Sequence, residues 1–589
     1  MNENLHISLT YNDNKIVEIP VGEMTFFDEF YVDCQVETLD KSVHGLRGTR
    51  LRMTLHPKED ITLQEIDIQL DKIYLPAGRI FCNGYQSWSE SREFSPRERI
   101  PRLRRMARPL KYWMGDEFFP QIQRKSGWLH SWTYTYVRTG KDFFFAGSLS
   151  EKTAFTLFQH DTKNDKLHAQ PDCAGLVLQH SFPIVDMVFL HGKEKRCFDT
   201  YFDLLEIEKP KAKPAIGWTS WYHYYTDISE EIILKNLTAW REKEGEKNPF
   251  ETDFRPEQIF QIDDGWQTAV GDWLSVTDKF PNGMSPIAAK IKAERYIPGL
   301  WLAPFICDTR SDIFKNRKHW LLKDEKGKPL RIGYSPLWKG GFYALDFYNG
   351  EVQDYLTKVF MTVLQKWGYG MLKLDFLYAV CIQTRPNKTR GQIMHEAMQF
   401  IRNIVGDKLI LGCGVPLGSA FGLVDYCRIG ADIHLEWEHK MLAFLNDRER
   451  VSTIVSLRTT LGRWQLNNRA FHNDPDVFLL RKEKQKLTPT QQDTILKINA
   501  LLGNLVFTSD YLGNYNTEQT EEFFDLEILM DKTLHSVEQL ENDGYKIIFE
   551  RDGKRFVCLC NLSNSSRSMM HGRETIKLEG FESMILKNI

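Results

Sequence analysis

Residues 258–264, QIFQIDD, and residues 370–376, GMLKLDF, share one form: a short apolar run that ends at one or two aspartates. Short apolar runs bounded by polar or turn residues predict buried strands. Further runs of this kind alternate with stretches of helical periodicity between about residues 215 and 510. They are AIGWTSW (215–221), PGLWLAPF (298–305), KLILGCG (408–414), DYCRIGAD (425–432), NNRAFHND (467–474) and NLVFTSD (504–510). This alternation predicts βα units and a parallel sheet.

Eight strands within about 300 residues match the number and size of a (β/α)8 TIM barrel. A doubly wound sheet also alternates in this way, but no GxGxxG motif follows the first strand. Polar residues recur at the C-terminal ends of the strands, which is where a barrel forms its active site. We therefore predict a TIM barrel over residues 209–515.

The sequences on either side have a different rhythm. Residues 1–208 contain short alternating runs such as ITLQEIDIQL (61–70), which predict an N-terminal antiparallel β-sandwich domain. The charged, proline-bearing stretch KPKAKP (209–214) suits a domain boundary. From about residue 516 the helical period fades, and KIIFERDGKRFVCLCNLS (546–563) predicts a hairpin that turns at Asp552–Gly553. We expect a small C-terminal β-sandwich domain over residues 516–589.

Composition excludes several classes of protein. A chain of 589 residues with 42% hydrophobic residues, 26% charged residues and a net charge of −3 is typical of a globular protein, with no bias toward nucleic acid or membranes. The ten cysteines form no CxxC pair and the N-terminus carries no signal-peptide pattern, so we expect a cytoplasmic location. The basic stretch PRERIPRLRRMARPLK (96–111) is interpreted as a solvated arm or subunit interface rather than a polyanion site. A homo-oligomer is left open.

The carboxylates carry the chemistry. Asp263 with Asp264, Asp375 and Asp432 close three different strand candidates, and in a barrel those positions converge. One strand-terminal aspartate alone would be interpreted as a helix cap. Glycosidic cleavage needs two carboxyl groups at the anomeric carbon, one ionised and one protonated. Aromatic residues make up 13% of the chain, and many stand beside polar ones, which suits the stacking and hydrogen bonding of sugars.

Several motifs together point to one family. In chain order they are NGYQSWS, GWTSW, QIDDGWQ, WLAPF, LKLDFLY, CRIGAD, HNDPD and FTSD. Their sequence and order resemble the melibiase-type α-galactosidases of glycoside hydrolase family 36, which are related to family 27 and to the raffinose-pathway enzymes. The resemblance covers nearly the whole chain and implies a retaining glycosidase whose partner is an oligosaccharide or glycoconjugate.

The resemblance implies a role for each matching residue. Asp375 would be the nucleophile and Asp432 the acid/base, while the Asp263–Asp264 pair would hold the 4- and 6-hydroxyls of galactose. Lys373 and Arg428 would bind near the nucleophile, and we expect their charges to lower the pKa of Asp375. The remaining substrate-binding candidates are Trp88, Trp221, Trp266 and Trp301 as walls, and Cys413 and Gly414 near the 2-hydroxyl.

One motif departs from the family pattern, and it leaves alternatives open. GCGVPLGSAFG (412–422) keeps Cys413 and Gly414 but lacks the glycine-rich run and arginine that many members carry. N-acetylgalactosamine is therefore an alternative to galactose, and transfer to a second sugar is an alternative to hydrolysis. A non-catalytic sugar-binding protein would be favoured only if a carboxylate were missing. His434 and His439 do not form an HExxH motif, so neither a metal nor a cofactor is expected.

Overall fold

The computed structural model describes residues 4–41, 45–73, 78–110, 114–115, 119–140, 142–246 and 254–587. At its centre, parallel strands follow the order β25-β24-β23-β22-β18-β17-β16-β27-β26. The two ends of this order, β25 and β26, are separated in sequence only by Pro475 and Asp476, so the sheet closes on itself. The prediction of a (β/α)8 barrel is confirmed, with its seventh strand split in two. The strands are β16 (Ala215–Thr219), β17 (Glu257–Ile262), β18 (Ile297–Leu302), β22 (Met371–Leu374), β23 (Leu409–Gly412), β24 (Tyr426–Arg428), β25 (His472–Asp474), β26 (Val477–Phe478) and β27 (Leu505–Thr508).

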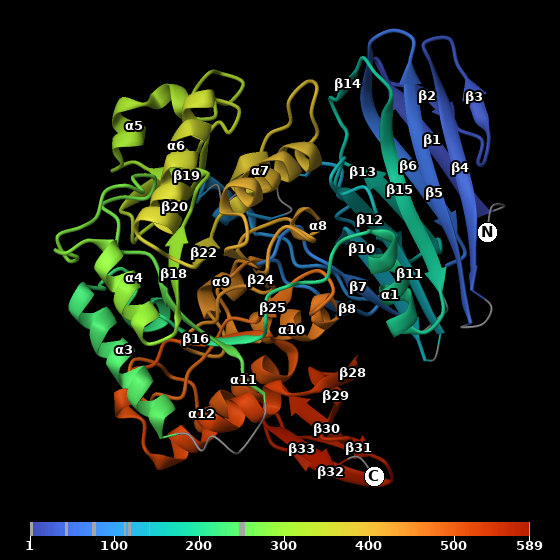
Figure 1. Ribbon diagram of the computed structural model, residues 1–589. Coiled ribbons are helices and arrows are strands. Elements are labelled where there is room, and N and C mark those ends of the chain that lie inside the picture. The colour runs from blue at the N-terminus through green and yellow to red at the C-terminus, as the bar shows by residue number, and fades with distance from the viewer. Residues whose placement is uncertain are drawn as a thin grey trace.

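Helices cover the outside of the barrel (Figure 1). Their starts follow local capping rules: Ser229 accepts a hydrogen bond from the backbone N–H of Ile232, and Thr389 forms a capping box with Gln392. Helix α6 (Gly350–Met361) continues into a short π-helical turn, Thr362–Lys366, before the chain reaches Gly368. The main helices are α3 (Glu230–Gly245), α4 (Met284–Ala293), α6 (Gly350–Met361), α7 (Arg390–Val405), α10 (Thr453–Gly462) and α11 (Pro489–Leu502).

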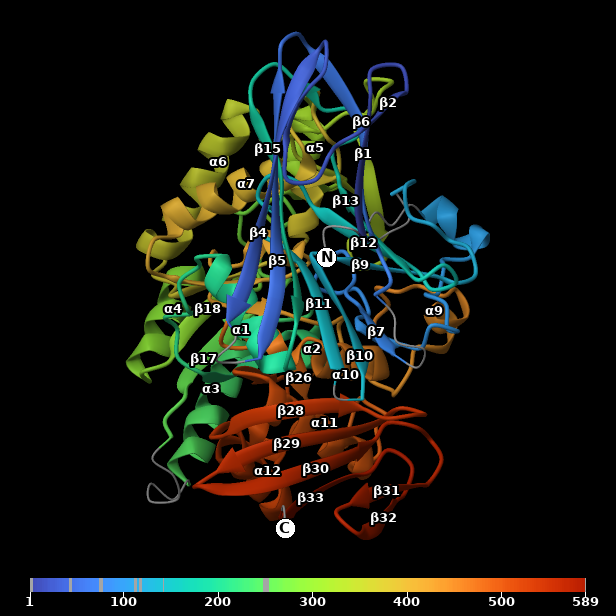
Figure 2. The same ribbon diagram turned by 90° about the vertical axis from the view of Figure 1, so that its right-hand side faces the viewer.

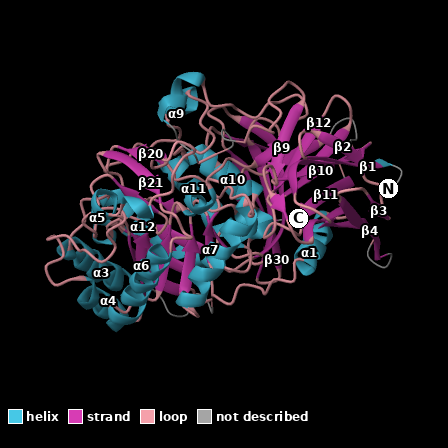
Figure 3. Cartoon of the chain, turned by 90° about the horizontal axis from the view of Figure 1, so that it is seen from above, coloured by secondary structure: helices cyan, strands magenta, loops and turns pink. Residues whose placement is uncertain are grey.

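The N-terminal part is the predicted antiparallel β-sandwich, and it stands beside the barrel (Figures 1 and 3). Alternate residues of its strands are buried, as in ITLQEIDIQL, and they form one apolar core between the two sheets. One sheet has β1 (Leu5–Tyr11), β2 (Lys15–Glu18), β6 (Ile61–Asp71), β9 (Trp128–Trp132), β12 (Thr156–Asp161), β13 (Lys166–Pro171) and β14 (Val177–Leu178). The other has β3 (Met24–Phe26), β4 (Phe30–Lys41), β5 (Leu46–Pro57), β7 (Arg79–Cys82), β8 (Arg92–Phe94), β10 (Tyr134–Thr139), β11 (Asp142–Ser148) and β15 (Phe182–His191).

The C-terminal strands form a small β unit below the barrel (Figure 2). The hairpin predicted at Asp552–Gly553 is present, because Arg551 pairs with Lys554 and both turn residues have positive φ. The expectation that helices end near residue 516 is wrong: Asn516 caps a further helix, α12 (Thr517–Met530), which packs on α11. The strands are β28 (Thr533–Gln539), β29 (Gly544–Arg551), β30 (Lys554–Asn561), β31 (Arg567–His571), β32 (Glu574–Leu578) and β33 (Ser583–Lys587).

A loop of the β-sandwich reaches into the barrel. This loop, residues 83–91, connects β7 to β8 and contains the NGYQSWS motif. Arg463, at the end of α10, is fully buried and donates hydrogen bonds to the carbonyl oxygens of Gly84, Gln86 and Ser87. The same guanidinium also donates to Asn83 Oδ1 and Ile429 O. The loop is therefore fixed by a side chain of the barrel, although it belongs to the N-terminal strands.

Candidate active site

The Asp263–Asp264 pair follows β17 directly and lines a cavity at the C-terminal ends of the strands. Both side chains are buried. Asp263 Oδ2 accepts a hydrogen bond from Lys373 Nζ at 2.8 Å, and Asp264 Oδ2 accepts one from Trp338 Nε1 at 2.8 Å. Burial raises the pKa of Asp264 to about 6. The pair thus presents carboxylate oxygens that can accept hydrogen bonds from a bound ligand.

Asp375 follows β22 and lies in the same cavity. Its Oδ2 accepts a hydrogen bond from Trp301 Nε1 at 3.0 Å, and its Oδ1 accepts one from the backbone N–H of Phe376. Burial raises the pKa of Asp375 to about 6, although the Lys373 ammonium and the Trp301 indole N–H lower it. The expectation of a lowered pKa is wrong, because desolvation exceeds the effect of the neighbouring cation. The carboxyl group is still mostly ionised at pH 7.

Asp432 follows β24 and also lines this cavity, with a side chain 36% exposed. Its Oδ1 accepts a hydrogen bond from Arg428 at 2.7 Å. The same guanidinium contacts Asp474 at 3.1 Å and Asp476 at 2.9 Å, both fully buried in the HNDPD motif. One cation is therefore shared by three carboxyl groups. Asp474 and Asp476 do not line the cavity themselves, and they hold Arg428 in place beside it.

Three of the four predicted tryptophans line the cavity: Trp88, Trp221 and Trp301. The expectation for Trp266 is corrected, because its side chain is fully buried behind the cavity and its Nε1 donates to the carbonyl oxygen of Trp301. It packs edge-on against Trp367 in the apolar core. Trp266 thus supports the wall that Trp301 presents to the cavity.

Cys413 lines the cavity at the end of β23, but Gly414 does not. A Cβ on Gly414 would lie only 2.9 Å from the indole of Trp88, and its φ of +58° also favours glycine. The carbonyl oxygen of Val415 accepts a hydrogen bond from the backbone N–H of Ser87 in the inserted loop, and the backbone N–H of Val415 donates to Ser87 Oγ. The small residues after Cys413 therefore make room for the loop that carries Trp88, rather than widening the cavity.

A hairpin that the sequence analysis did not identify closes another side of the cavity. It consists of β20 (Arg331–Ser335) and β21 (Gly340–Ala344), between the third and fourth barrel strands. Its buried residue Trp338 holds Asp264. Alternating polar and apolar residues can indicate a strand, but they do not indicate that the strand lies beside a cavity. The sequence therefore contains no local signal for the role of this hairpin. The other lining residues missed are Met114, Tyr334, Ser335, Pro336, Leu337, Phe342, Phe376, Glu449 and Val451.

The cavity has a volume of about 240 Å³. It brings together the carboxyl groups of four aspartates from β17, β22 and β24, one lysine, one arginine and several indole rings. Within the described ranges, no group of three or more His, Cys, Asp and Glu side chains is arranged to hold a metal ion. Among the same residues, no helix has both the length and the apolarity needed to cross a bilayer.

Comparison with known sequences finds similarity over part of the chain. Residues 250–408 match the family model described as Melibiase. An α-galactosidase of Escherichia coli is 30% identical over 123 residues, which cover 20% of this chain and 16% of that protein. The A type blood α-D-galactosamine galactosaminidase of Flavonifractor plautii is 27% identical over 186 residues, covering 26% of this chain and 16% of that protein. Each alignment spans well under two-thirds of the curated relative.

Comparison with solved structures extends the similarity to most of the chain. TtGalA, an α-galactosidase from Thermus thermophilus solved in complex with p-nitrophenyl α-D-galactopyranoside, superposes with a TM-score of 0.69 and 25% sequence identity. The match covers 91% of this chain and 98% of that chain. The similarity therefore includes the β-sandwich and the barrel, and not only the segment matched by the family model.

Proposed function

We propose that this melibiase-type chain is a retaining α-galactosidase that removes terminal α-galactosyl residues from oligosaccharides or glycoconjugates. One observation carries the proposal: Asp375 and Asp432, from two barrel strands, share a cavity with the Asp263–Asp264 pair. Glycoside cleavage needs two carboxyl groups at the reacting carbon, and groups that accept hydrogen bonds from the sugar hydroxyls hold the substrate beside them. The complex of TtGalA with stachyose supports an oligosaccharide as the substrate.

The mechanism follows from the surroundings of each carboxyl group. Asp375, fixed by Trp301 and mostly ionised at pH 7, attacks the anomeric carbon while protonated Asp432 gives its proton to the departing glycosidic oxygen. The galactosyl group is then held as an ester on Asp375. In the second step Asp432, now a carboxylate, takes a proton from water, which attacks the same carbon. The ester bond breaks, and galactose leaves with its original α configuration.

We assign recognition of galactose to Asp263 and Asp264, which line the cavity. Asp263 is held by Lys373 and Asp264 by Trp338, so both carboxylates are oriented before a sugar enters. A buried carboxylate left without its hydroxyl partner costs binding free energy, so glucose, whose 4-hydroxyl points elsewhere, should be rejected. Trp88 occupies the space beside Gly414, which supports a 2-hydroxyl rather than an acetamido group.

The test is a screen of nitrophenyl α-glycosides of galactose, N-acetylgalactosamine, glucose and xylose. We expect the galactoside to have the highest kcat/KM, exceeding the glucoside by roughly a hundredfold or more, because a misplaced hydroxyl leaves a buried polar group unpaired. A preference for the N-acetylated sugar would overturn the substrate assignment but leave the mechanism unchanged. This alternative is included because a relative from Flavonifractor plautii is described as a galactosaminidase. Transfer of galactose to a second sugar in preference to water would identify a transferase.

The pH dependence of catalysis provides a second prediction. Because the pKa of Asp375 is about 6 and the nucleophile must be ionised, kcat/KM should fall as the pH drops through 6. Trp301→Phe removes an N–H donor that lowers this pKa, so the acid limb of the profile should move to higher pH. The control is Trp367→Phe, which changes a ring outside the cavity. An acid limb that stays in place in the Trp301 variant would contradict the nucleophile's assignment.

The cysteines support a cytoplasmic location. All ten are free and buried, and Cys558 Sγ lies 3.6 Å from Cys560 Sγ without a bond between them. Buried thiols with no disulfide are typical of a reducing compartment.

A further inference from the structure

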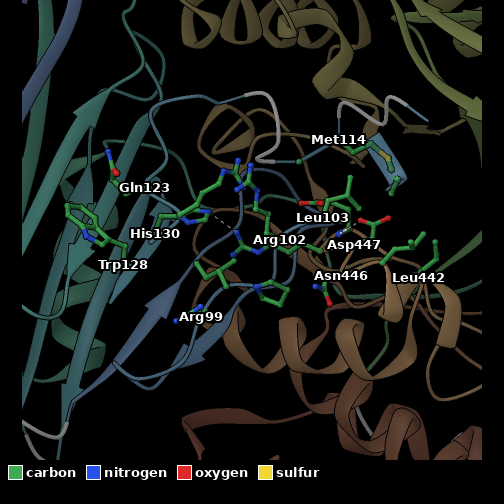
Figure 4. A pocket seen from close by; sticks show the side chains of 18 of the residues that line it. Arg99, Arg102, Leu103, Met114, Gln123, Trp128, His130, Leu442, Asn446 and Asp447 are labelled. Carbon is green, nitrogen blue, oxygen red and sulfur yellow. Dashed lines mark hydrogen bonds between the residues drawn. The ribbon is translucent and has the colours of Figure 1, made fainter. Parts of the chain in front are cut away.

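A second, larger cavity adjoins the catalytic one. Its volume is about 410 Å³, and the two cavities share Met114 and Glu449 in their linings. Figure 4 shows the side chains that line this second cavity. The basic stretch noted in the sequence supplies part of its wall. The cationic side chains around it are Arg99, Arg102, Arg124, Lys125 and Arg448, and we call this space the basic cavity.

Positive charge exceeds negative charge in the basic cavity. Of the lining residues that the structure describes, five carry cationic side chains and two, Asp447 and Glu449, carry carboxylates. Both carboxylates have protein partners, since Glu449 accepts from Ser89 Oγ and Asp447 accepts from the backbone N–H of Glu449. Arg99 and Arg102 make neither an ion pair nor a hydrogen bond with any residue in the described ranges. Unpaired cations in a concave site concentrate positive potential and attract anions.

The interior of the basic cavity is ordered by hydrogen bonds. Arg448 is buried and donates to the carbonyl oxygens of Glu90 and Cys82, and it contacts His130 Nε2 at 3.2 Å. In Figure 4, Arg102 is drawn between His130 and Asp447, while Trp128 stands at the far side. Arg448 is thus part of the frame, whereas Arg99 and Arg102 are available to a ligand. An indole ring and free guanidinium groups suit a sugar that bears an anion.

The chain connects the basic cavity to the acid/base residue. The segment from Leu442 to Glu449 lines the cavity, and it lies between Asp432 and Ser452 in the sequence. The backbone N–H of Ser452 donates to the carbonyl oxygen of Asp432 at 2.9 Å, which closes this segment into a loop. Asp432 is the residue assigned to protonate the departing oxygen. The basic cavity is therefore bounded by the loop that begins at Asp432, and it adjoins the catalytic cavity at Met114 and Glu449.

We propose that the basic cavity binds the phosphate of a phosphorylated sugar, and this proposal rests on the α-galactosidase function given above. The sugar phosphate is either the leaving group of the substrate or a separate molecule bound beside the catalytic cavity. Arg99 and Arg102 face a concave site of limited volume, which favours a small anion over a nucleic acid, since a nucleic acid would need an extended basic track. The experiments below distinguish the two sources.

The first experiment compares melibiose with melibiose phosphorylated on its glucose. The native enzyme should show a kcat/KM roughly tenfold or more higher for the phosphorylated sugar, as expected for charge-assisted hydrogen bonds. The double variant Arg99→Gln/Arg102→Gln should lose this preference and keep its activity on melibiose. The matched control is Arg97→Gln/Arg105→Gln, which removes two exposed cations of the same segment that do not line the cavity. An equal loss in the control pair would contradict the proposal.

The second experiment uses calorimetry to measure binding of glucose and of glucose 1-phosphate, whose phosphate leaves the 6-oxygen free for the galactosyl linkage of melibiose. The enzyme could bind the sugar phosphate but not glucose, lose this binding in the Arg99/Arg102 variant, and show no preference for phosphorylated melibiose. That result would support the cavity as a site for a separate sugar phosphate. No binding together with no substrate preference would overturn the proposal. Calorimetry needs no turnover, so it tests the basic cavity even if the enzyme cleaves no α-galactoside. A lack of α-galactoside cleavage would refute the proposed function and not the binding of a sugar phosphate.

Discussion

Replacing Asp375 by alanine is expected to reduce kcat on nitrophenyl α-galactoside by roughly 10⁴-fold or more, the scale found when an essential nucleophile is removed. The reason is that no other carboxylate follows β22, so the galactosyl ester cannot form. Among the described residues, the Asp375 carboxylate accepts hydrogen bonds only from Trp301 Nε1 and the backbone N–H of Phe376, so the protein should remain folded without it. Turnover, thermal unfolding and the anomeric configuration of the first product would be measured together.

The control for this prediction is Asp474→Asn, which alters a buried carboxylate that contacts Arg428 but not the cavity. It should retain measurable turnover, because it removes no reacting group. Full activity of the Asp375→Ala variant would refute the assignment, and so would release of β-galactose by the native enzyme.

Replacing Asp432 by alanine should separate the two chemical steps. With a nitrophenyl leaving group, which needs little protonation, the galactosyl ester should still form; its hydrolysis should slow by roughly 10²–10⁴-fold without general-base help. Azide should then restore turnover, because a small anion attacks without losing a proton. The product should be α-galactosyl azide, identified by NMR.

Two comparisons sharpen this result. Azide should leave the native enzyme almost unaffected, since water is already activated there. With melibiose, whose leaving group must be protonated, the variant should be inactive in both the presence and the absence of azide. Formation of β-galactosyl azide would mean that azide attacks the substrate rather than the ester, and the double-displacement scheme would be wrong.

The sequence predicted those site residues whose position depends on the periodicity of the strands and on where each strand ends. The strands ending at Asp263, Asp375 and Asp432 could be predicted to converge, because the barrel places every strand's C-terminal end on one face. The hairpin at Asp552–Gly553 was predictable from local sequence. A two-residue hairpin turn of type I′ needs positive φ at both of its residues, and an Asp-Gly pair adopts such angles readily.

The remaining features depend on contacts between distant segments. Trp266 looks like a pocket residue beside two aspartates, yet its ring turns into the core, and no neighbour in sequence indicates this. Trp338 reaches Asp264 from 74 positions away. The pKa of Asp375 depends on the balance between burial and one lysine, and only the packed structure gives the extent of burial.

The hydrogen bonds between Arg463 and the loop at residues 83–91 limit how this gene can be recombined. A shortened gene encoding only the predicted barrel segment, residues 209–515, would produce a protein without Trp88 in its cavity. Its Arg463 would also lose the carbonyl oxygens of Gly84, Gln86 and Ser87, leaving a buried charge uncompensated, which is strongly destabilising. Exchanging N-terminal segments between homologues should therefore yield active chimaeras only when the loop and the arginine are inherited together.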